Sequence, residues 1–329
     1  MKRAQYTERG PDPQASIAAV ESATPEPAAG QALLEVLAAP INPSDVLTLT
    51  GLYGMLPPLP AVGGNEGVGR VLALGPDTQG PAIGQTVLLP VGCGTWSTHV
   101  LADAKSLMPL PNDADPLQLA MMTVNPPTAL LMLREFVDLQ PGEWVIQNAA
   151  NSGVGAYLIQ LAKARGLKTV NVVRRESAVA GVRETGGDVV LVDAPDLAKR
   201  VREATGGAAI RLGIDAVGGA GTDHLAMSLT EGGVLVNYGA MSGEPCQVSP
   251  ASFVFRNITL RGFWLSKWFI GSTPAQRIAV FGEVATLIAT GKLKSRIQAT
   301  YGIDQIKQAV AAAAAGERNG KILLVPNAQ

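Results

Sequence analysis

The sequence predicts an α/β protein with two domains, one rich in β-strands and one built on a doubly wound parallel sheet. Three observations lead to this prediction. At 329 residues the chain is long for a single hydrophobic core. About the first 120 residues carry short β-type runs broken by Gly and Pro. From about residue 142 onward, strand-like and helix-like segments alternate.

The first part of the chain is predicted to form a compact β-rich or barrel-like domain, because turn signals arrive about every ten residues. Its β-type runs read ALLEVLAAPI, VGRVLALG, QTVLLPVG and STHVLAD.

The second part is predicted to form the parallel sheet. Its strands are nearly continuous runs of Val, Ile and Leu, which is typical of a sheet covered by helices on both faces. The alternating segments read EWVIQNA, VGAYLIQLAKAR, KTVNVVRR, AVAGVRETG, DVVLVD, LAKRVREATG, RLGIDAV, TDHLAMSLT and GGVLVNYG. The segment NITLRGFWLS is predicted as the sixth strand, which ends the sheet.

The C-terminal elements are expected to return to the first domain, because the sheet is already complete at six strands. They are a long helix in PAQRIAVFGEVATLIATG, a small strand near IQATYG, an Ala-rich helix in DQIKQAVAAAAAG and a last strand in KILLVP. We therefore expect one domain to comprise residues 1–122 and 270–329, and the other to comprise residues 123–269.

The composition narrows the classes of function. Hydrophobic residues make up 47% of the chain and charged residues 16%, as in a well-buried globular protein. A net charge of −1 without a basic run does not favour binding to nucleic acid or to an anionic membrane. No apolar stretch is long enough for a membrane span, and the N-terminus lacks the features of a signal or transit peptide. Two cysteines, Cys93 and Cys246, fit a reducing compartment, so a cytoplasmic protein is expected.

The loop QNAANSGVG, at residues 147–155, is a candidate phosphate-binding loop between a strand and a helix. Compared with the pattern G-x-G-x-x-G, Ala150 and Ser152 replace the first two glycines and Gly155 is the third. Ala and Ser are small enough for close approach of the backbone to a pyrophosphate. Asn151 and Ser152 add side-chain donors, and Gly153 adds a flexible position. The alternative is an ordinary turn between a strand and a helix.

The end of the next strand predicts which dinucleotide binds. An NAD site usually places Asp or Glu there to accept a hydrogen bond from the ribose 2′-hydroxyl. Here KTVNVV is followed by Arg174 and Arg175, which suit the 2′-phosphate of NADPH. Glu176 could instead accept the hydrogen bond from the ribose of NAD. A third possibility is that these residues are only a solvated charge cluster at the end of a strand. NADPH is the predicted cofactor.

A β-rich domain followed by a dinucleotide domain resembles the plan of the medium-chain dehydrogenases and reductases, many of which bind zinc. At the three positions where zinc-dependent alcohol dehydrogenases carry ligands, this chain has Asn42, Asn65 and Val124. Asn and Val do not form a tetrahedral zinc site of nitrogen and sulfur ligands. The other candidate ligands are scattered along the chain: Cys93, His99, His224 and Cys246. No metal is expected.

Several motifs in order resemble one branch of these enzymes, the mitochondrial-type 2-enoyl thioester reductases. They are INPSD, GLYGMLPPLPAVGGNEGVG, VNPPTA, VIQNAANSGVG, NVVRRE, YGAM and RGFWLSKW, and the resemblance runs from about residue 30 to the C-terminus. It implies a GroES-like catalytic domain and a Rossmann domain. It also implies NADPH-dependent, zinc-free reduction of trans-2-enoyl-CoA or enoyl-acyl carrier protein in fatty acid metabolism. Pro127 and Ala240 depart from the family pattern, which has small residues and a glycine there.

The resemblance also implies the site residues. The catalytic tyrosine of the family falls on Tyr53. The cofactor contacts fall on Asn125, Asn151, Ser152, Gly153, Val154, Arg174, Arg175, Glu176, Tyr238, Gly239, Ala240, Met241, Phe263, Trp264, Leu265, Ser266 and Lys321.

A tyrosine suits this chemistry without a metal. When a hydride reaches C3 of the enoyl thioester, C2 needs a proton, and a phenol with a pKa of about 10 is protonated at neutral pH. The alternative for Tyr53 is a half-buried aromatic that only packs. Trp264 is expected to line the acyl pocket or the nicotinamide side, or else to pack within its strand.

Two other functions share this scaffold. One is a zinc-free NADPH:quinone or alkenal reductase. The other is a role like that of the zeta-crystallins, as a lens or RNA-binding protein, which the absence of a basic patch argues against. A homodimer is expected from the resemblance and because NITLRGFWLS would otherwise leave a bare sheet edge.

Overall fold

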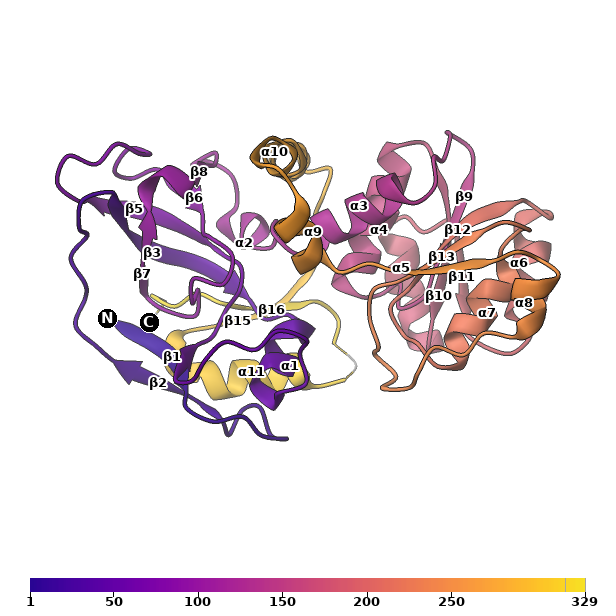
Figure 1. Ribbon diagram of the computed structural model, residues 1–329, viewed down its shortest axis with the longest axis horizontal. Coiled ribbons are helices and arrows are strands. Elements are labelled where there is room, and N and C mark those ends of the chain that lie inside the picture. The colour runs from indigo at the N-terminus through magenta and orange to yellow at the C-terminus, as the bar shows by residue number, and fades with distance from the viewer. Residues whose placement is uncertain (317, 329) are drawn as a thin grey trace. The chain divides into compact units, whose positions relative to one another are not determined.

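The structure is a computed structural model that describes residues 1–316 and 318–328 (Figure 1). The chain divides into two compact units. Unit 1 comprises Met1–Val124 and Phe281–Gln329, and unit 2 comprises Asn125–Val280. The expected boundaries were 122/123 and 269/270, so the second division falls later in the chain, inside helix α10 (Pro274–Ala289).

Unit 1 contains, in its described part, a seven-stranded and a three-stranded sheet. The larger has the order β15-β16-β3-β5-β6-β8, with β7 paired to β3. Its strands are β3 (Gln31–Pro40), β5 (Val68–Leu74), β6 (Thr86–Leu88), β7 (His99–Asp103), β8 (Met108–Pro109), β15 (Ile297–Tyr301) and β16 (Lys321–Leu324). The smaller sheet has the order β2-β1-β4, formed by β1 (Lys2–Tyr6), β2 (Ile17–Glu21) and β4 (Ala61–Val62).

The β-rich first domain is confirmed, and so is the return of the C-terminal strands to it. Strand β16 pairs antiparallel with β3 through Leu323 and Pro40, which closes the chain end onto the first long strand. Burial alternates along most of β3, because one face of an antiparallel strand packs on the core while the other is more open. The remaining helical elements of unit 1 are α1 (Pro43–Thr50), η1 (Ala104–Ser106), α2 (Pro116–Leu119), η3 (Ile303–Gln305) and α11 (Ile306–Ala314).

Unit 2 is built on a six-stranded parallel sheet with the order β11-β10-β9-β12-β13-β14, counted over the residues that the structure describes (Figure 1). The doubly wound sheet is therefore confirmed. Its strands are β9 (Trp144–Gln147), β10 (Lys168–Val173), β11 (Val189–Val192), β12 (Ile210–Asp215), β13 (Val234–Asn237) and β14 (Thr259–Gly262).

Helices cover both faces of this sheet. Along β10, Val172 packs in a core cluster with α6 and α7, whereas Val173 packs in another cluster with α4 and α5. The helical elements of unit 2 are α3 (Asn125–Glu135), α4 (Gly153–Ala164), η2 (Glu176–Ala178), α5 (Val179–Glu184), α6 (Leu197–Thr205), α7 (Ala220–Ser228), α8 (Pro250–Val254) and α9 (Leu265–Gly271), with the start of α10. None of the helices in the described parts of the chain is long and apolar enough to cross a membrane.

The prediction of one continuous strand over NITLRGFWLS is wrong in its second half. Strand β14 covers only Thr259–Gly262, and helix α9 starts at Leu265. Leu265 is buried, and Trp264, the residue before the helix, keeps an extended backbone. A run of large apolar residues is typical of a strand, but here the backbone turns into helix α9 after Trp264 and buries Leu265 at the first helical position.

Candidate active site

The candidate phosphate loop lies between β9 and α4. Ser152 is the N-cap of α4, and its hydroxyl accepts a hydrogen bond of 3.1 Å from the N–H of Gly155. Gly153 and Val154 are the first two helical residues, so helix geometry provides no intrahelical acceptor for their N–H groups. These two amides, at the positive end of a twelve-residue helix, fit the pyrophosphate of a dinucleotide.

Gly155 is the one glycine of the pattern G-x-G-x-x-G that this chain keeps at its aligned position, and close packing of α4 against the loop explains it. A side chain on Gly155 would place its Cβ 2.6 Å from the carbonyl oxygen of Ala150. The left-handed backbone of the loop is found at Ala149, with φ of 45°, which is one residue before the position aligned with the first glycine. Asn151 is exposed, so its side chain is open to a ligand.

The residues predicted to select the cofactor follow the end of β10. Arg174 and Glu176 are exposed, and Arg175 is half-buried. Within the described residues, the side chain of Arg174 makes no hydrogen bond or ion pair, so its guanidinium is available to a 2′-phosphate. Arg175 precedes η2, the 3₁₀ turn that starts at Glu176.

A second segment predicted to contact the cofactor, Tyr238–Met241, follows β13. Its backbone is tied to the end of β12, since the N–H of Tyr238 donates to the carbonyl oxygen of Asp215 at 2.9 Å. Gly239 lies so close to β12 that a Cβ would be 2.8 Å from the oxygen of Ala216. Burial raises the pKa of Tyr238, and a hydrogen bond with Ser152 acts in the opposite direction. Ala240 and Met241 are exposed.

The third predicted segment, residues 263–266, follows β14. The N–H of Phe263 donates to the carbonyl oxygen of Asn237 at 2.9 Å, so this segment leaves the sheet beside the end of β13. The Phe263 ring meets the ring of Phe136 edge to face, with centroids 6.1 Å apart. Trp264 is 40% exposed, whereas Leu265 is buried and offers little more than its backbone. Ser266 is half-buried at the start of α9.

The two remaining predicted cofactor residues lie in different units. Asn125 is buried and opens α3 in unit 2. Lys321 belongs to unit 1, where it is buried at the start of β16. The predicted contacts are therefore gathered mainly at the carboxyl ends of β9, β10 and β13, at the start of α4, and after β14.

Tyr53, the predicted proton donor, lies just after α1 in unit 1. The helix ends at Gly51, whose φ is 81°, and the N–H of Tyr53 donates to the carbonyl oxygen of Leu47 at 3.2 Å. Tyr53 is half-buried. Exposed apolar side chains surround it in the sequence: Leu52, Met55, Leu56 and Leu59.

A buried polar network occupies the region where zinc enzymes carry their ligands. The Glu66 carboxylate accepts hydrogen bonds from Asn42 Nδ2 at 2.6 Å and from the N–H groups of Thr123 and Val124 at 3.1 and 2.8 Å. The Lys321 ammonium donates to Asn42 Oδ1. Burial raises the pKa of Glu66 to about 7 and lowers the pKa of Lys321 to about 8, and each charge partly offsets the shift of the other.

The same network fixes the start of α1. Asp45, in the first turn, accepts from the N–H of Asn42 at 2.7 Å and from Asn65 Nδ2 at 2.6 Å. Burial raises the pKa of Asp45 to about 6. With the Asn42 amide bonded to Glu66 and to an ammonium group, and with Val124 contributing its backbone, these residues do not fit a zinc site.

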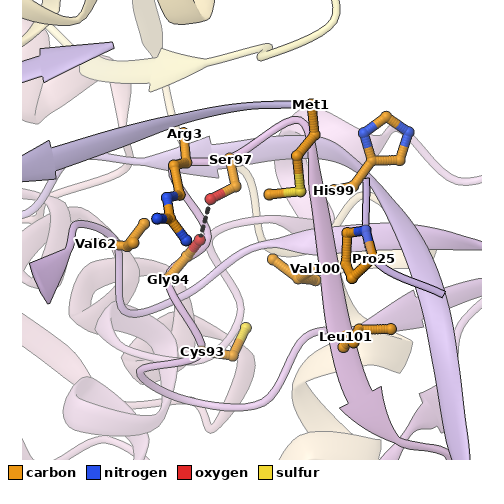
Figure 2. Close-up of a pocket in the computed structure, with 10 residues that line it drawn as sticks. All are labelled: Met1, Arg3, Pro25, Val62, Cys93, Gly94, Ser97, His99, Val100 and Leu101. Carbon is orange, nitrogen blue, oxygen red and sulfur yellow. Dashed lines mark hydrogen bonds between the residues drawn. The ribbon is translucent and has the colours of Figure 1, made fainter. Parts of the chain in front are cut away.

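The scattered His and Cys residues form no alternative metal centre. Cys93 and His99 both line a hollow in unit 1 but lie apart from each other in it (Figure 2). Burial raises the pKa of the Cys93 thiol to about 12, so it stays protonated at neutral pH. His224 pairs with Asp193 at 2.8 Å in unit 2, and Cys246 is exposed. Over the residues that the structure describes, no group of three or more His, Cys, Asp or Glu could hold a metal.

Sequence reasoning missed two sets of residues. One is the partners of the buried network, Asp45 and Glu66, although NPSD and GGNEG were both singled out as motifs. The other is Asp215 with Asn148 at the carboxyl ends of β12 and β9. A polar residue at the end of an apolar strand is the signal that could have indicated the second set.

Two family models match parts of the chain. The alcohol dehydrogenase GroES-like domain matches residues 28–112, and the zinc-binding dehydrogenase model matches residues 153–280. Among similar proteins, the mitochondrial enoyl-[acyl-carrier-protein] reductase of Caenorhabditis elegans is 38% identical over 277 residues, which are 82% of this chain and 79% of the relative. The human enzyme of the same name is 39% identical over 269 residues, which are 79% of this chain and 71% of the relative.

Solved structures of two kinds of reductase are similar to nearly the whole chain. The complex of Etr1p with NADP and crotonyl-CoA superimposes with a TM-score of 0.87 at 25% identity, covering 98% of both chains. A Bacillus thuringiensis structure described as an NADPH:quinone reductase gives a TM-score of 0.88 at 28% identity, again over 98% of both chains. The Etr1p/Etr2p heterodimer of Candida tropicalis gives 0.86 at 26% identity, with 98% coverage of both chains.

Proposed function

Because the chain belongs to the family of the mitochondrial enoyl-[acyl-carrier-protein] reductases, within the medium-chain dehydrogenases and reductases, we propose that it reduces trans-2-enoyl thioesters. The reaction saturates the C2=C3 bond of an enoyl-CoA or an enoyl-acyl carrier protein and uses NADPH. The observation that carries this proposal is the surroundings of Tyr53. A phenol follows a helix whose start is fixed by hydrogen bonds between Asn42 and Asp45, and exposed apolar side chains suited to an acyl chain flank it in the sequence.

The residues present fit the cofactor. The N–H groups of Gly153 and Val154 would hold the pyrophosphate, and Arg174 with Arg175 would hold the 2′-phosphate. When bound, NADPH supplies the hydride that adds to C3. The donors to the 2′-phosphate favour NADPH over NADH, because NADH lacks the group that they bind.

Tyr53 supplies the second hydrogen. Its O–H donates a proton to C2, so that one hydride and one proton together saturate the double bond. A phenol positioned at the reacting carbon can act as a general acid in this way. Hydrogen-bond donors of the protein would stabilise the charge that develops on the thioester oxygen.

The experiment that tests the function compares two oxidants. Oxidation of NADPH is followed by absorbance with crotonyl-CoA as one substrate and a quinone as the other. We expect a much larger kcat/KM with crotonyl-CoA. Turnover of the quinone alone would replace the proposal by the quinone reductase function that the Bacillus thuringiensis neighbour suggests.

A homodimer is also proposed. Strand β14 is the edge of the six-stranded sheet, and a second copy could pair with it antiparallel. Helix α8, which precedes β14, leaves Phe253, Val254 and the adjoining Phe255 exposed. Three consecutive exposed apolar side chains are suited to burial against a second copy.

A cytoplasmic location is proposed from cysteine chemistry. Both Cys93 and Cys246 are free thiols, as is usual in a reducing compartment. The relatives carry the word mitochondrial in their names. Fractionation of the source cells with an antibody to this chain would decide between the two.

A further inference from the structure

The strand order of unit 2 places a topological switch point between β9 and β12. From β9 the chain runs to β10 and β11 on one side, then crosses to β12, β13 and β14 on the other. In doubly wound sheets, ligands bind outside the carboxyl ends of the strands at this point. Asn148 directly follows β9, and Asp215 is the last residue of β12, so these two residues border the switch point.

The two side chains are joined across it. Asn148 Nδ2 donates to Asp215 Oδ1 at 2.6 Å, and Asn148 Oδ1 accepts from the N–H of Ala216 at 2.8 Å. Both residues are buried. The NH2 group and the oxygen of the Asn148 amide therefore both bind the carboxyl end of β12.

Asp215 connects this pair to a third strand end. Its Oδ1 also accepts from the N–H groups of Val217 and Gly218, at 2.9 and 3.1 Å. Its Oδ2 accepts from Thr222 Oγ1 at 2.7 Å and from Asn237 Nδ2 at 3.0 Å. Asn237 is the last residue of β13, and its amide also donates to the carbonyl oxygen of Gly239 at 2.9 Å.

Five donors thus converge on one buried carboxyl group, which matches the purely accepting character of a carboxylate. The strand ends that they join are the ones from which two predicted cofactor segments start. Asn148 belongs to the phosphate loop, as the first residue after β9, and the segment Tyr238–Met241 begins directly after Asn237.

We propose that Asp215, together with Asn148, is a positioning residue for the dinucleotide. It holds the phosphate loop and the segment after β13 at one fixed separation, so that the pyrophosphate and the rest of the dinucleotide meet preformed contacts. The proposal rests on the proposed function for the identity of the cofactor. It concerns parts of the cofactor that NADPH and NADH share, and in this it differs from the role of Arg174.

The variant Asp215→Asn tests this proposal, because it keeps the size of the side chain. The new amide places an NH2 group where one of the two carboxylate oxygens accepted hydrogen bonds. In one orientation this NH2 group faces the donors of Asn148 and of two backbone N–H groups, and in the other it faces those of Thr222 and Asn237. Asp196→Asn is the matched control, since Asp196 is an exposed residue that pairs with Arg200.

Binding of NADPH and of NADH is measured on the full-length protein by cofactor fluorescence, without thioester. For Asp215→Asn we expect the Kd of both cofactors to rise by the same factor, roughly tenfold to a hundredfold. The kcat with crotonyl-CoA at saturating NADPH should change less than KM for NADPH. The control should bind both cofactors like the wild type.

A lower melting temperature with unchanged Kd values would show that Asp215 only stabilises the fold, and a loss confined to NADPH would also overturn the proposal. If Asp215→Asn does not fold, Asn237→Ala carries the test, because it removes only the contacts to Asp215 Oδ2 and Gly239. A several-fold rise of both Kd values is then expected, and unchanged values refute the idea. Failure of the proposed function is distinguishable, because the wild type would then bind cofactor without reducing crotonyl-CoA.

Discussion

Substitution of Gly155 by alanine tests how closely α4 packs against the loop that precedes it. An added Cβ would lie 2.6 Å from the carbonyl oxygen of Ala150 and 2.8 Å from that of Ala149. Both contacts are to backbone atoms, so no side chain can rotate away to relieve them. The first turn of α4 must therefore move away from the loop, and the N–H groups of Gly153 and Val154 move with it.

The size of the effect follows from these distances. To reach even a tight contact of 3.0 Å, the helix must shift by at least 0.4 Å, the difference between 3.0 and 2.6 Å. Overpacking of this kind destabilises by about 1–3 kcal/mol, and the better helix propensity of alanine returns up to about 1 kcal/mol. Subtracting the full 1 kcal/mol leaves a net loss of about 0–2 kcal/mol, which lowers Tm by up to about 8 °C. The Kd for NADPH should rise about tenfold, because the donors to the pyrophosphate are displaced.

Gly181→Ala is the matched control for this variant. Gly181 lies within α5 in the same unit, and nothing lies within 4 Å of a Cβ added there. That change should stabilise by about 0.5–1 kcal/mol and leave the Kd for NADPH unchanged. Tm is measured by circular dichroism and Kd by cofactor fluorescence. If Gly155→Ala raised Tm and bound NADPH as the wild type does, the inferred close packing of α4 would be incorrect.

Four further predictions concern other parts of the molecule. Tyr53→Phe should lower kcat with crotonyl-CoA by about 10²–10⁴-fold while the Kd for NADPH holds, and a wild-type kcat would show that Tyr53 only packs. Arg174→Ala should weaken NADPH binding roughly tenfold or more and leave the Kd for NADH nearly unchanged. The variant of another exposed arginine, Arg183→Ala, is the control. Equal losses for both cofactors would contradict the assignment of Arg174 to the 2′-phosphate. Light scattering should give twice the 34.0 kDa chain mass for the wild type and the single mass for Phe255→Glu, and a monomeric wild type would refute the dimer. The pKa of Glu66 is raised from 4.5 to about 7 in the folded state, so between these pH values the folded protein binds a proton that the unfolded chain has lost, and the free energy of unfolding should fall as the pH rises. The slope contributed by Glu66 is at most about 1.4 kcal/mol per pH unit, and denaturant titrations should show a flatter slope for Glu66→Gln. An unchanged slope would count against the raised pKa.

The sequence alone determined those features that depend on local pattern or on a single side chain. Runs of Val, Ile and Leu that alternate with helical segments predict a parallel sheet, because strands buried on both faces need apolar residues at every position. The βα junction before Gly155 and the arginines after β10 could be located for the same reason, since each motif follows directly from its strand. Asn42, Asn65 and Val124 likewise allow a prediction about zinc from the sequence, because ligand chemistry depends on residue type.

Only the tertiary structure decided which distant polar groups meet. Lys321 and Asn42 are 279 positions apart, and Asn148 and Asp215 are 67 apart, yet each pair is in contact. The ammonium of Lys321, a residue that the resemblance places with the cofactor, lies in the buried network with Asn42 and Glu66. No periodicity marks such contacts, because a single buried polar residue leaves the apolar pattern of its strand or loop almost unchanged. Its partner is selected by the need to satisfy hydrogen bonds and charge in the folded core, and that requirement exists only once the strands are assembled.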